Sequence, residues 1–283
     1  MPVTPQDPSA GGNVSASAPG NGDGSLLNPV DRGRLWVEIG IVLALSLGAS
    51  ALYSILSLIA SLTAEKPLGS QSTGLNQATS TREWLDFANQ FLGFALGLAP
   101  VALVLYLLWR PRANPFSELG LDIRPSLIGR DAGRALFLVA VIGIPGIGLY
   151  AIGRLLGITV AVQAAPQDQY WWTIPMLILA ALKAGLLEEV IVIGYLYKRL
   201  DQLGWGTWKI IIASALLRGS YHLYQGIGPF FGNVVMGVVF GWCYRRWGRV
   251  MPLVLAHTLI DIISFVGFPL ALAWWPGIFG VTK

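Results

Sequence analysis

The chain has 283 residues, of which 54% are hydrophobic and 12% are charged, and its formal net charge is +4 at pH 7. Soluble domains carry about 25% charged residues, so the composition excludes an ordinary soluble domain, and the small net charge excludes a basic face for nucleic acid. A single cysteine, Cys243, excludes an internal disulfide and a cysteine-rich metal site. The apolar runs have the length of membrane helices, about 20 residues, rather than that of barrel strands. We therefore expect an all-α, polytopic helical membrane protein in a lipid bilayer, with no nucleic-acid partner.

Residues 1–30 are rich in Pro, Gly, Ser, Ala and Asn, show no apolar periodicity, and predict a disordered tail. The tail lacks a basic start followed closely by an apolar core, so it is not expected to be a signal peptide. The rest of the chain predicts seven or eight membrane-spanning helices. The apolar stretches lie at about residues 35–62, 91–109, 134–156, 172–197, 209–224, 229–244, 250–266 and 268–281.

Lys and Arg are concentrated in alternate connections between these stretches. The basic connections contain Arg32 and Arg34; Arg110, Arg112, Arg124, Arg130 and Arg134; Lys198, Arg199 and Lys209; and Arg245, Arg246 and Arg249. The other connections keep Lys66, Arg82 and Arg154. Cytoplasmic loops carry such an excess, so we expect a multi-pass protein of the cell (plasma) membrane with a cytoplasmic N-terminus.

The apolar C-terminal half contains few ionisable groups, and their positions indicate a site. Glu188 and Glu189 are adjacent within the stretch 172–197, and the two histidines of the chain, His222 and His257, lie in later stretches. Asp261 follows His257 by one helical turn, so the two share a face. A charge at bilayer depth costs about 2.5–3.5 kcal/mol on insertion scales, which makes each such residue a functional candidate.

These groups suit peptide hydrolysis, which needs a carboxylate to deprotonate water and donors to hold the developing oxyanion. Adjacent helical residues point about 100° apart, so we do not expect both glutamates to face one water. A carboxylate and two histidines can equally hold Zn²⁺ with an open water position. A zinc site at Glu188, His222 and His257 therefore stays open as an alternative to a reaction without a cofactor, although no HExxH motif is present.

Three short motifs, in order, resemble those of the CPBP family of intramembrane proteases, which includes the CAAX prenyl endopeptidases and the Abi, or bacteriocin-immunity, proteins. The first motif, Glu-Glu-xxx-Arg, reads Glu188-Glu189-Val-Ile-Val-Ile193 here; the second, Phe-xxx-His, reads Arg218-Gly-Ser-Tyr-His222; and the third, His-xxx-Asn/Asp, reads His257-Thr-Leu-Ile-Asp261. The resemblance covers roughly residues 172–266.

The resemblance implies an intramembrane endopeptidase that acts on a membrane-associated peptide or protein, and a catalytic helical core at 171–267. That core would follow N-terminal transmembrane helices and loops at 31–170 and precede a short apolar segment at 268–283. Glu188, His222, His257 and Asp261 would be its catalytic positions. Glu188 would be the base of a glutamate-type protease without a cofactor, and His257, oriented by Asp261, would position water or stabilise the oxyanion. The chain looks like bacterial members, for which prenylated substrates are not expected.

Two motif positions depart from the family pattern, because Ile193 stands where the motif has Arg and Arg218 where it has Phe. In the family that Arg pairs with the second glutamate. Arg218 lies one turn before His222, on the same face, so it could supply the missing charge to Glu189 from a neighbouring helix. The alternative interpretation is that the lost Arg marks a member with weakened or no proteolysis.

Two other classes of function stay open. One is a non-catalytic membrane scaffold or immunity-type protein that keeps the fold, and the departure at Ile193 favours it. The other is a proton-coupled transporter, since chains of Glu, His and Asp also line proton pathways. The sequence shows neither an internal repeat nor the paired broken helices typical of transporters.

Overall fold

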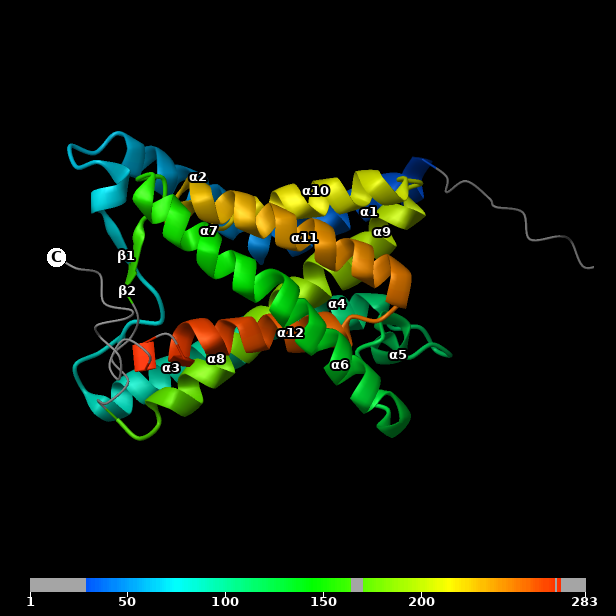
Figure 1. The fold of residues 1–283 in the computed structure, drawn as a ribbon. Helices are drawn as coiled ribbons and strands as arrows, with labels where there is room; N and C mark the ends of the chain where they lie inside the picture. The colour runs from blue at the N-terminus through cyan, green and yellow to red at the C-terminus, as the bar shows by residue number, and fades with distance from the viewer. Residues whose placement is uncertain (1–28, 164–169, 268, 271–283) are drawn as a thin grey trace, which may run out of the picture.

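The computed structural model describes residues 29–163, 170–267, 269 and 270, and this part of the chain is almost entirely helical (Figure 1). The predicted tail at 1–30 and terminal segment at 268–283 lie almost wholly outside the described residues. The helices are α1 (Pro29–Ala44), α2 (Leu47–Leu62), α3 (Glu83–Gly97), α4 (Ala99–Leu108), α5 (Pro115–Leu119), α6 (Ile128–Leu138), α7 (Ile144–Leu155), α8 (Thr173–Glu188), α9 (Leu196–Gln202), α10 (Thr207–Ser220), α11 (Ile227–Trp247) and α12 (Met251–Ile262). Three π-helical segments continue helices, η3 (Val139–Gly143), η4 (Glu189–Tyr195) and η6 (Ile263–Gly267). The 3-10 turns are η1 (Leu68–Ser70), η2 (Pro125–Leu127) and η5 (Leu223–Gln225).

The helices form two layers, which Figure 1 shows one above the other. In the upper layer α10 packs on α11 and on α2, and in the lower layer α8 packs on α12 and α3. Glycines permit the tightest approach in the upper layer, since a Cβ added to Gly237 of α11 would lie 2.8 Å from the Cα of Ala215 of α10. The chain passes from the lower layer to the upper layer through η4, which therefore lies between them.

Three helical stretches among the described residues are long and apolar enough to cross a membrane, at Glu83–Leu108, Pro125–Leu155 and Ile227–Trp247. A fourth candidate, α1 with α2, covers the span expected at 35–62 and is bent by 57° between the two helices. The Ser46 hydroxyl donates to the carbonyl oxygen of Val42 at 2.6 Å, and such a bond to residue i−4 bends helices. Only glycine fits at position 48, because an added Cβ would lie 2.7 Å from the Leu43 carbonyl oxygen.

Other elements differ from the sequence-based expectation. The stretch 172–197 is a helix whose second half is the π-helical segment η4, and α10 ends at Ser220, so His222 lies in the turn that follows. The polar loop after α2 contributes a strand, β1 (Ser72–Gly74), which pairs in parallel with β2 (Ala161–Gln163), with Thr73 opposite Val162. The sequence predicted neither strand, because three-residue strands carry no periodic signal.

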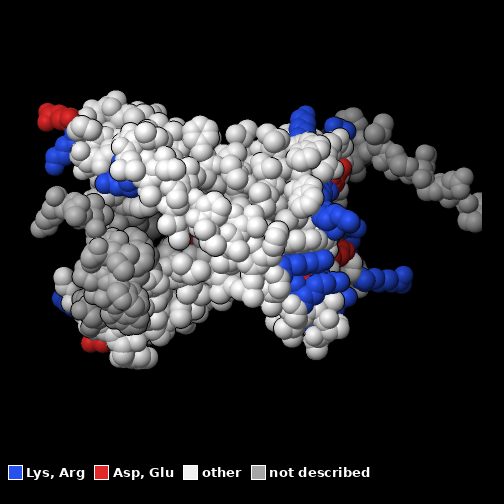
Figure 2. Space-filling view, viewed as in Figure 1, with Lys and Arg blue, Asp and Glu red and all other residues white. Residues whose placement is uncertain are grey.

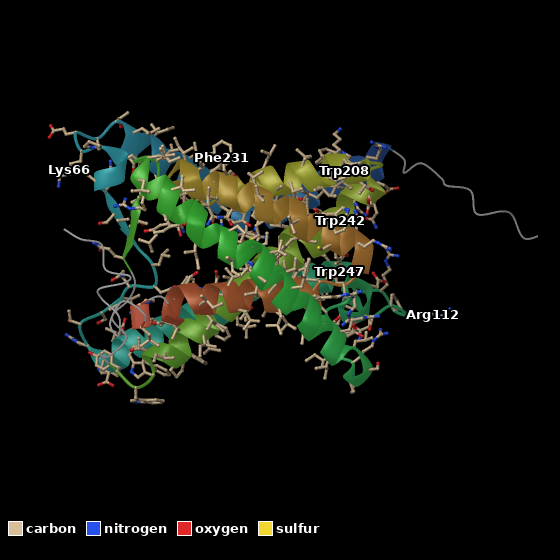
Figure 3. All side chains as sticks on the ribbon, viewed as in Figure 1. Lys66, Arg112, Trp208, Phe231, Trp242 and Trp247 are labelled. Carbon is tan, nitrogen blue, oxygen red and sulfur yellow. The ribbon has the colours of Figure 1, made fainter. Side chains whose placement is uncertain are left out.

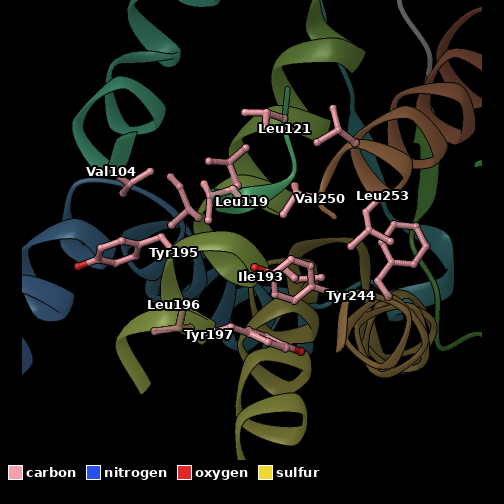
Figure 4. Close-up of a cluster of buried hydrophobic side chains, with 14 of the residues drawn as sticks. Val104, Leu119, Leu121, Ile193, Tyr195, Leu196, Tyr197, Tyr244, Val250 and Leu253 are labelled. Atoms are coloured by element: carbon pink, nitrogen blue, oxygen red, sulfur yellow. The ribbon is translucent and has the colours of Figure 1, made fainter. Parts of the chain in front are cut away.

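The apolar core surrounds η4, whose residues are all buried. Figure 4 shows side chains that converge on it from several helices, among them Val104 of α4, Leu119 of α5 and Leu253 of α12. Ile193 belongs to this cluster and is 1% exposed. A core that encloses η4 holds the start of that segment, where the glutamate pair lies, in a defined position.

The four basic connections meet at one end of the molecule, where Figure 2 shows most of the visible Lys and Arg. Side-chain contacts join them: Arg32 to the Leu203 carbonyl oxygen (3.2 Å), Lys198 to Glu118 (2.7 Å) and Arg249 to Asp122 (3.0 Å). Exposed aromatic side chains such as Trp208 and Trp242 lie near this end, and Lys66 lies at the other (Figure 3). Aromatic rings beside a basic end are typical of a membrane interface.

Candidate active site between the two layers

The glutamate pair lies where α8 passes into η4. Glu188 is the last residue of α8 and Glu189 the first of η4, and π-helical turns occur frequently at functional sites. Close packing of α8 on α12 brings the pair to the centre of the protein. A Cβ added to Gly185 would lie 2.6 Å from Thr258 Oγ1 and 3.1 Å from the Val254 carbonyl oxygen, so only glycine permits this approach. Glu189 is fully buried, and Glu188 is nearly so.

Arg218 of α10 supplies the positive charge for both carboxylates. Its Nη2 lies 2.7 Å from Glu189 Oε1 and 3.3 Å from Glu188 Oε2, and its side chain is 1% exposed. The contact with Glu189 is the one expected from the two motif departures, and the compensation for Ile193 stays a prediction. The two glutamates were expected to point apart, and they do so only in part. Both contact Nη2 of Arg218, but their other contacts are with different residues.

Glu188 turns toward the residues that follow α10. The Tyr221 hydroxyl donates to Glu188 Oε2 at 2.8 Å, and His222 Nε2 lies 3.9 Å from the same oxygen, beyond hydrogen-bond distance. Arg218 lies in the last turn of α10, and Tyr221 and His222 lie in the turn that follows the helix, so the end of α10 brings all three side chains to Glu188. Both ring nitrogens of His222 are buried, and neither forms a hydrogen bond with a described residue, so neither is engaged in a structural contact.

Glu189 turns toward His257 of α12. Its Oε1 lies 2.7 Å from His257 Nδ1, which is also 3.0 Å from Arg218 Nη2. A carboxylate only accepts and a guanidinium only donates, so Nδ1 either carries a proton and donates to Glu189 or lacks one and accepts from Arg218. The other ring nitrogen, Nε2, lies 3.6 Å from Asp261 Oδ2, one helical turn away as expected.

The four predicted catalytic positions therefore converge, although they are spread over residues 188–261 and three helical regions. They form one chain of neighbours from His222 through Glu188, Arg218 and His257 to Asp261. The sequence predicted this convergence, but it assigned Arg218 only to Glu189. The guanidinium in fact joins the two halves of the site, since a single nitrogen contacts both Glu188 and His257.

The residues suggested for zinc do not form a ready metal site in this arrangement. Within the described part of the chain, no three His, Cys, Asp or Glu side chains are grouped so that they could hold a metal ion. The Arg218 guanidinium lies between Glu188 and His257, two of the three suggested ligands. A cation bound by these residues would have to displace another positive charge.

A cavity of about 310 Å³ lies away from this cluster, at the start of α3 and α8. Glu83, Trp84, Phe87, Trp171 and Trp172 line it. Trp172 immediately precedes α8 and Glu188 is its last residue, so the length of the helix separates the cavity from the glutamates by about 24 Å. This cavity is therefore a different place from the cluster of Glu188, His222 and His257.

Two residues of the site escaped the sequence analysis. Tyr221 contacts Glu188 directly, and Ser54 of α2 donates to the Tyr221 carbonyl oxygen at 2.8 Å. A signal for Tyr221 exists in the sequence, because an aromatic residue with a polar tip stands three positions after Arg218 on the same face. Ser54 has no local signal, since its partner is 167 residues away.

Comparison with known protein families supports the three motifs. Residues 170–263 match the family model described as type II CAAX prenyl endopeptidase Rce1-like, and no curated protein or solved structure matches the chain significantly. The matched segment contains Glu188, Glu189, Arg218, His222, His257 and Asp261. The segment that carries all six predicted site residues thus matches the CPBP and CAAX protease family that the motifs predicted.

Proposed function

We propose that the protein is an intramembrane endopeptidase that hydrolyses a peptide bond of a membrane-associated peptide or protein. The observation that carries this proposal is the convergence of Glu188, His222, His257 and Asp261 around one buried arginine. This cluster lies within the segment that matches a protease family. A purely structural ion pair does not require a histidine such as His222, whose nitrogens form no hydrogen bond with a described residue. Hydrolysis requires both a base for the water and donors for the oxyanion.

In the proposed reaction Glu188 takes a proton from water, and the hydroxide adds to the carbonyl carbon of the scissile bond. The contacts of Glu188 within the described part of the chain fall on Oε2, which makes Oε1 the oxygen that accepts the proton. We assign the donor to the developing oxyanion to His222 in place of His257, because Nδ1 of His257 is engaged by Glu189 or Arg218 while the nitrogens of His222 have no described partner. Glu188 then returns the proton to the leaving amine, and the bond between carbon and nitrogen breaks. Glu189 and Arg218 support this arrangement, and Asp261 orients His257.

We propose that the reaction needs no cofactor. The alternative, zinc held by Glu188, His222 and His257, requires Arg218 to move away from Glu188 and His257, which it contacts at 3.3 and 3.0 Å. Glu189 would then lose its cationic partner in a fully buried position and keep only the contact with His257. Removing the charged partner of a buried carboxylate is strongly destabilising, so the cluster favours water activation by Glu188 itself.

The proposed setting is the cell membrane, with seven or eight spans and the N-terminus in the cytoplasm. The common basic end supports this orientation, because the four basic connections contact one another there. The proposed organisation is a cytoplasmic tail at 1–30, N-terminal helices at 31–170, the catalytic core at 171–267 and a short apolar segment at 268–283.

The test is peptide cleavage by the purified protein in liposomes. Two quenched fluorescent probes are needed: a prenylated peptide with a Cys-aliphatic-aliphatic-X end, as the family description indicates, and an unprenylated apolar peptide. Glu188→Gln is expected to lower kcat about 10²- to 10⁴-fold, the usual contribution of a general base, and to leave the melting temperature nearly unchanged. Glu118→Gln, outside the site, is the matched control. Cleavage that survives Glu188→Gln would disprove the assignment, and inhibition by a chelator would favour the zinc alternative.

A membrane scaffold or immunity-type protein without peptidase activity is the second candidate. The observation that favours it is the position of the Arg218 guanidinium, 3.3 Å from Glu188 Oε2, because a nearby positive charge makes a carboxylate a weaker base. If the wild-type protein binds both probes without cleaving either, this candidate replaces the peptidase. A proton-coupled transporter, the less favoured third class, would instead carry protons into the liposomes, so the lumen would become acidic after the outer solution is acidified.

A further inference from the structure

Tyr221 forms the shortest described contact with Glu188, although it stands at a position that the second motif leaves unspecified. Its hydroxyl donates to Glu188 Oε2 at 2.8 Å, and its ring lies 5.0 Å from the ring of His222. The side chain is buried beside a buried carboxylate. A hydrogen bond from a hydroxyl to a carboxylate is stronger than one between neutral groups, so the phenol restrains the direction in which Glu188 points.

Tyr221 is in turn held by α2, a helix outside the segment 170–263. The buried residues of α2 are Leu47, Ala51 and Ser54, at positions i, i+4 and i+7, so one face of the helix packs inward. Leu47 and Ala51 form an apolar cluster with Tyr221 and with Val192 of η4. Ser54 Oγ donates to the Tyr221 carbonyl oxygen at 2.8 Å. The bend between α1 and α2 directs this face of α2 against the end of α10.

We propose that Tyr221 is a positioning residue that holds Glu188 by Oε2 and leaves Oε1 for water, and that α2 completes the site by fixing Tyr221 through Ser54. The effect on rate rests on the proposed peptidase function, whereas the contact between Tyr221 and Glu188 does not. Tyr221, Arg218 and His222 all approach the same oxygen, which is the arrangement that leaves one carboxylate oxygen for a reactant. The N-terminal helices are then part of the site and not only a membrane anchor.

The first experiment measures the contact without any substrate. Tyr221→Phe removes only the hydroxyl, and we expect it to lower the melting temperature in detergent by about 3–8 °C, as for a hydrogen bond to a charged group in a chain of this size. In a Glu188→Met background, which has no acceptor, the same change should cause no loss. Tyr197→Phe is the matched control, because Tyr197 is equally buried but contacts Ser214, and its effect should be equal in both backgrounds. An equal effect of Tyr221→Phe in both backgrounds would overturn the proposal.

The second experiment measures peptide cleavage by the folded variants. Tyr221→Phe should lower kcat about 10- to 100-fold, as expected for a misplaced catalytic group, with KM unchanged because substrate binding does not involve the phenol. Ser54→Ala should lower kcat less, Ser54→Thr should retain the rate, and Ser57→Ala, on the exposed side of α2, should change nothing. An unchanged kcat in Tyr221→Phe would overturn the positioning role. If the melting experiment shows the contact and the wild-type protein cleaves no probe, the peptidase proposal has failed and the contact stands.

Discussion

Arg249 and Arg218 are both buried, and each joins two carboxylates, but they use their nitrogens differently. Arg249, at the basic end, directs Nε to Asp131, Nη1 to Asp122, and Nη2 to Asp131 and to the Asp122 carbonyl oxygen, at 2.8–3.3 Å. Arg218, between the two layers, uses Nη2 for Glu188, Glu189 and His257. Its Nε and Nη1 are buried and form no hydrogen bond with a described residue.

The difference indicates that Arg249 has a structural role, whereas Arg218 belongs to a functional site. Arg249 is satisfied by the loop around Asp122, and it ties that loop to the start of α12. Burial would raise the pKa of Asp122, but the hydrogen bonds from Arg124 and Arg249 outweigh it and hold that pKa below its ordinary value. Arg218 keeps donors unused in the interior, a costly state that native proteins retain mainly at functional sites. The unused donors mark the region where we expect water or a reacting group.

The largest expected effect is on stability when either arginine is removed. Arg218→Ala removes the cation that pairs with the buried Glu188 and Glu189 and should lower the free energy of unfolding by about 3–5 kcal/mol. Arg249→Ala should cost less, about 2–3 kcal/mol, because Asp122, one of its two partners, is partly exposed and keeps its ion pair with Arg124. Urea unfolding in detergent measures both. Ile193→Arg combined with Arg218→Phe should recover part of the first loss, and no recovery would argue against the compensation.

Lysine substitutions should separate the two arginines more sharply. All described polar contacts of Arg218 are made by one nitrogen, Nη2, and the ammonium group of a lysine can take its place. We therefore expect Arg218→Lys to recover most of the stability that Arg218→Ala loses. Arg249→Lys cannot replace a guanidinium that bonds through three nitrogens, so it should recover little. The measurement is the ratio of the Lys effect to the Ala effect at each position. Equal ratios would mean that the two guanidinium groups are used alike.

The smallest expected effect is a pH dependence at the basic end. The hydrogen bond from Lys198 holds the pKa of Glu118 below its ordinary value of 4.5, against the opposing effect of burial. A lowered pKa in the folded state stabilises the protein above the ordinary value, and this stability is lost as the pH falls through the lowered one. The pair is partly exposed, so the contribution is below about 1 kcal/mol. Melting temperatures from pH 6 downward should fall less steeply for Lys198→Met than for the wild type, and parallel curves would show that the pair contributes nothing.

The sequence by itself determined the class of the protein and most members of the site. Both are indicated by local patterns: the apolar runs, the positions of Lys and Arg, and the three motifs. A local pattern can be recognised without knowledge of which helices pack together. The pairing of His257 with Asp261 is of this kind, because one helical turn places both on one face. The contact of Arg218 with Glu189 also followed from the sequence, since a buried carboxylate needs a partner and few cations were available.

Only the tertiary structure decided how these members meet. The approach of α8 to α12 at Gly185 sets the direction of the glutamate pair, and the π-helical start at Glu189 depends on the core around η4. The position of Arg218 between Glu188 and His257, and the support of Tyr221 by Ser54, join residues that are 30 to 167 positions apart. Such contacts depend on how whole helices pack, and side-chain periodicity within one helix carries no information about which neighbour it will face.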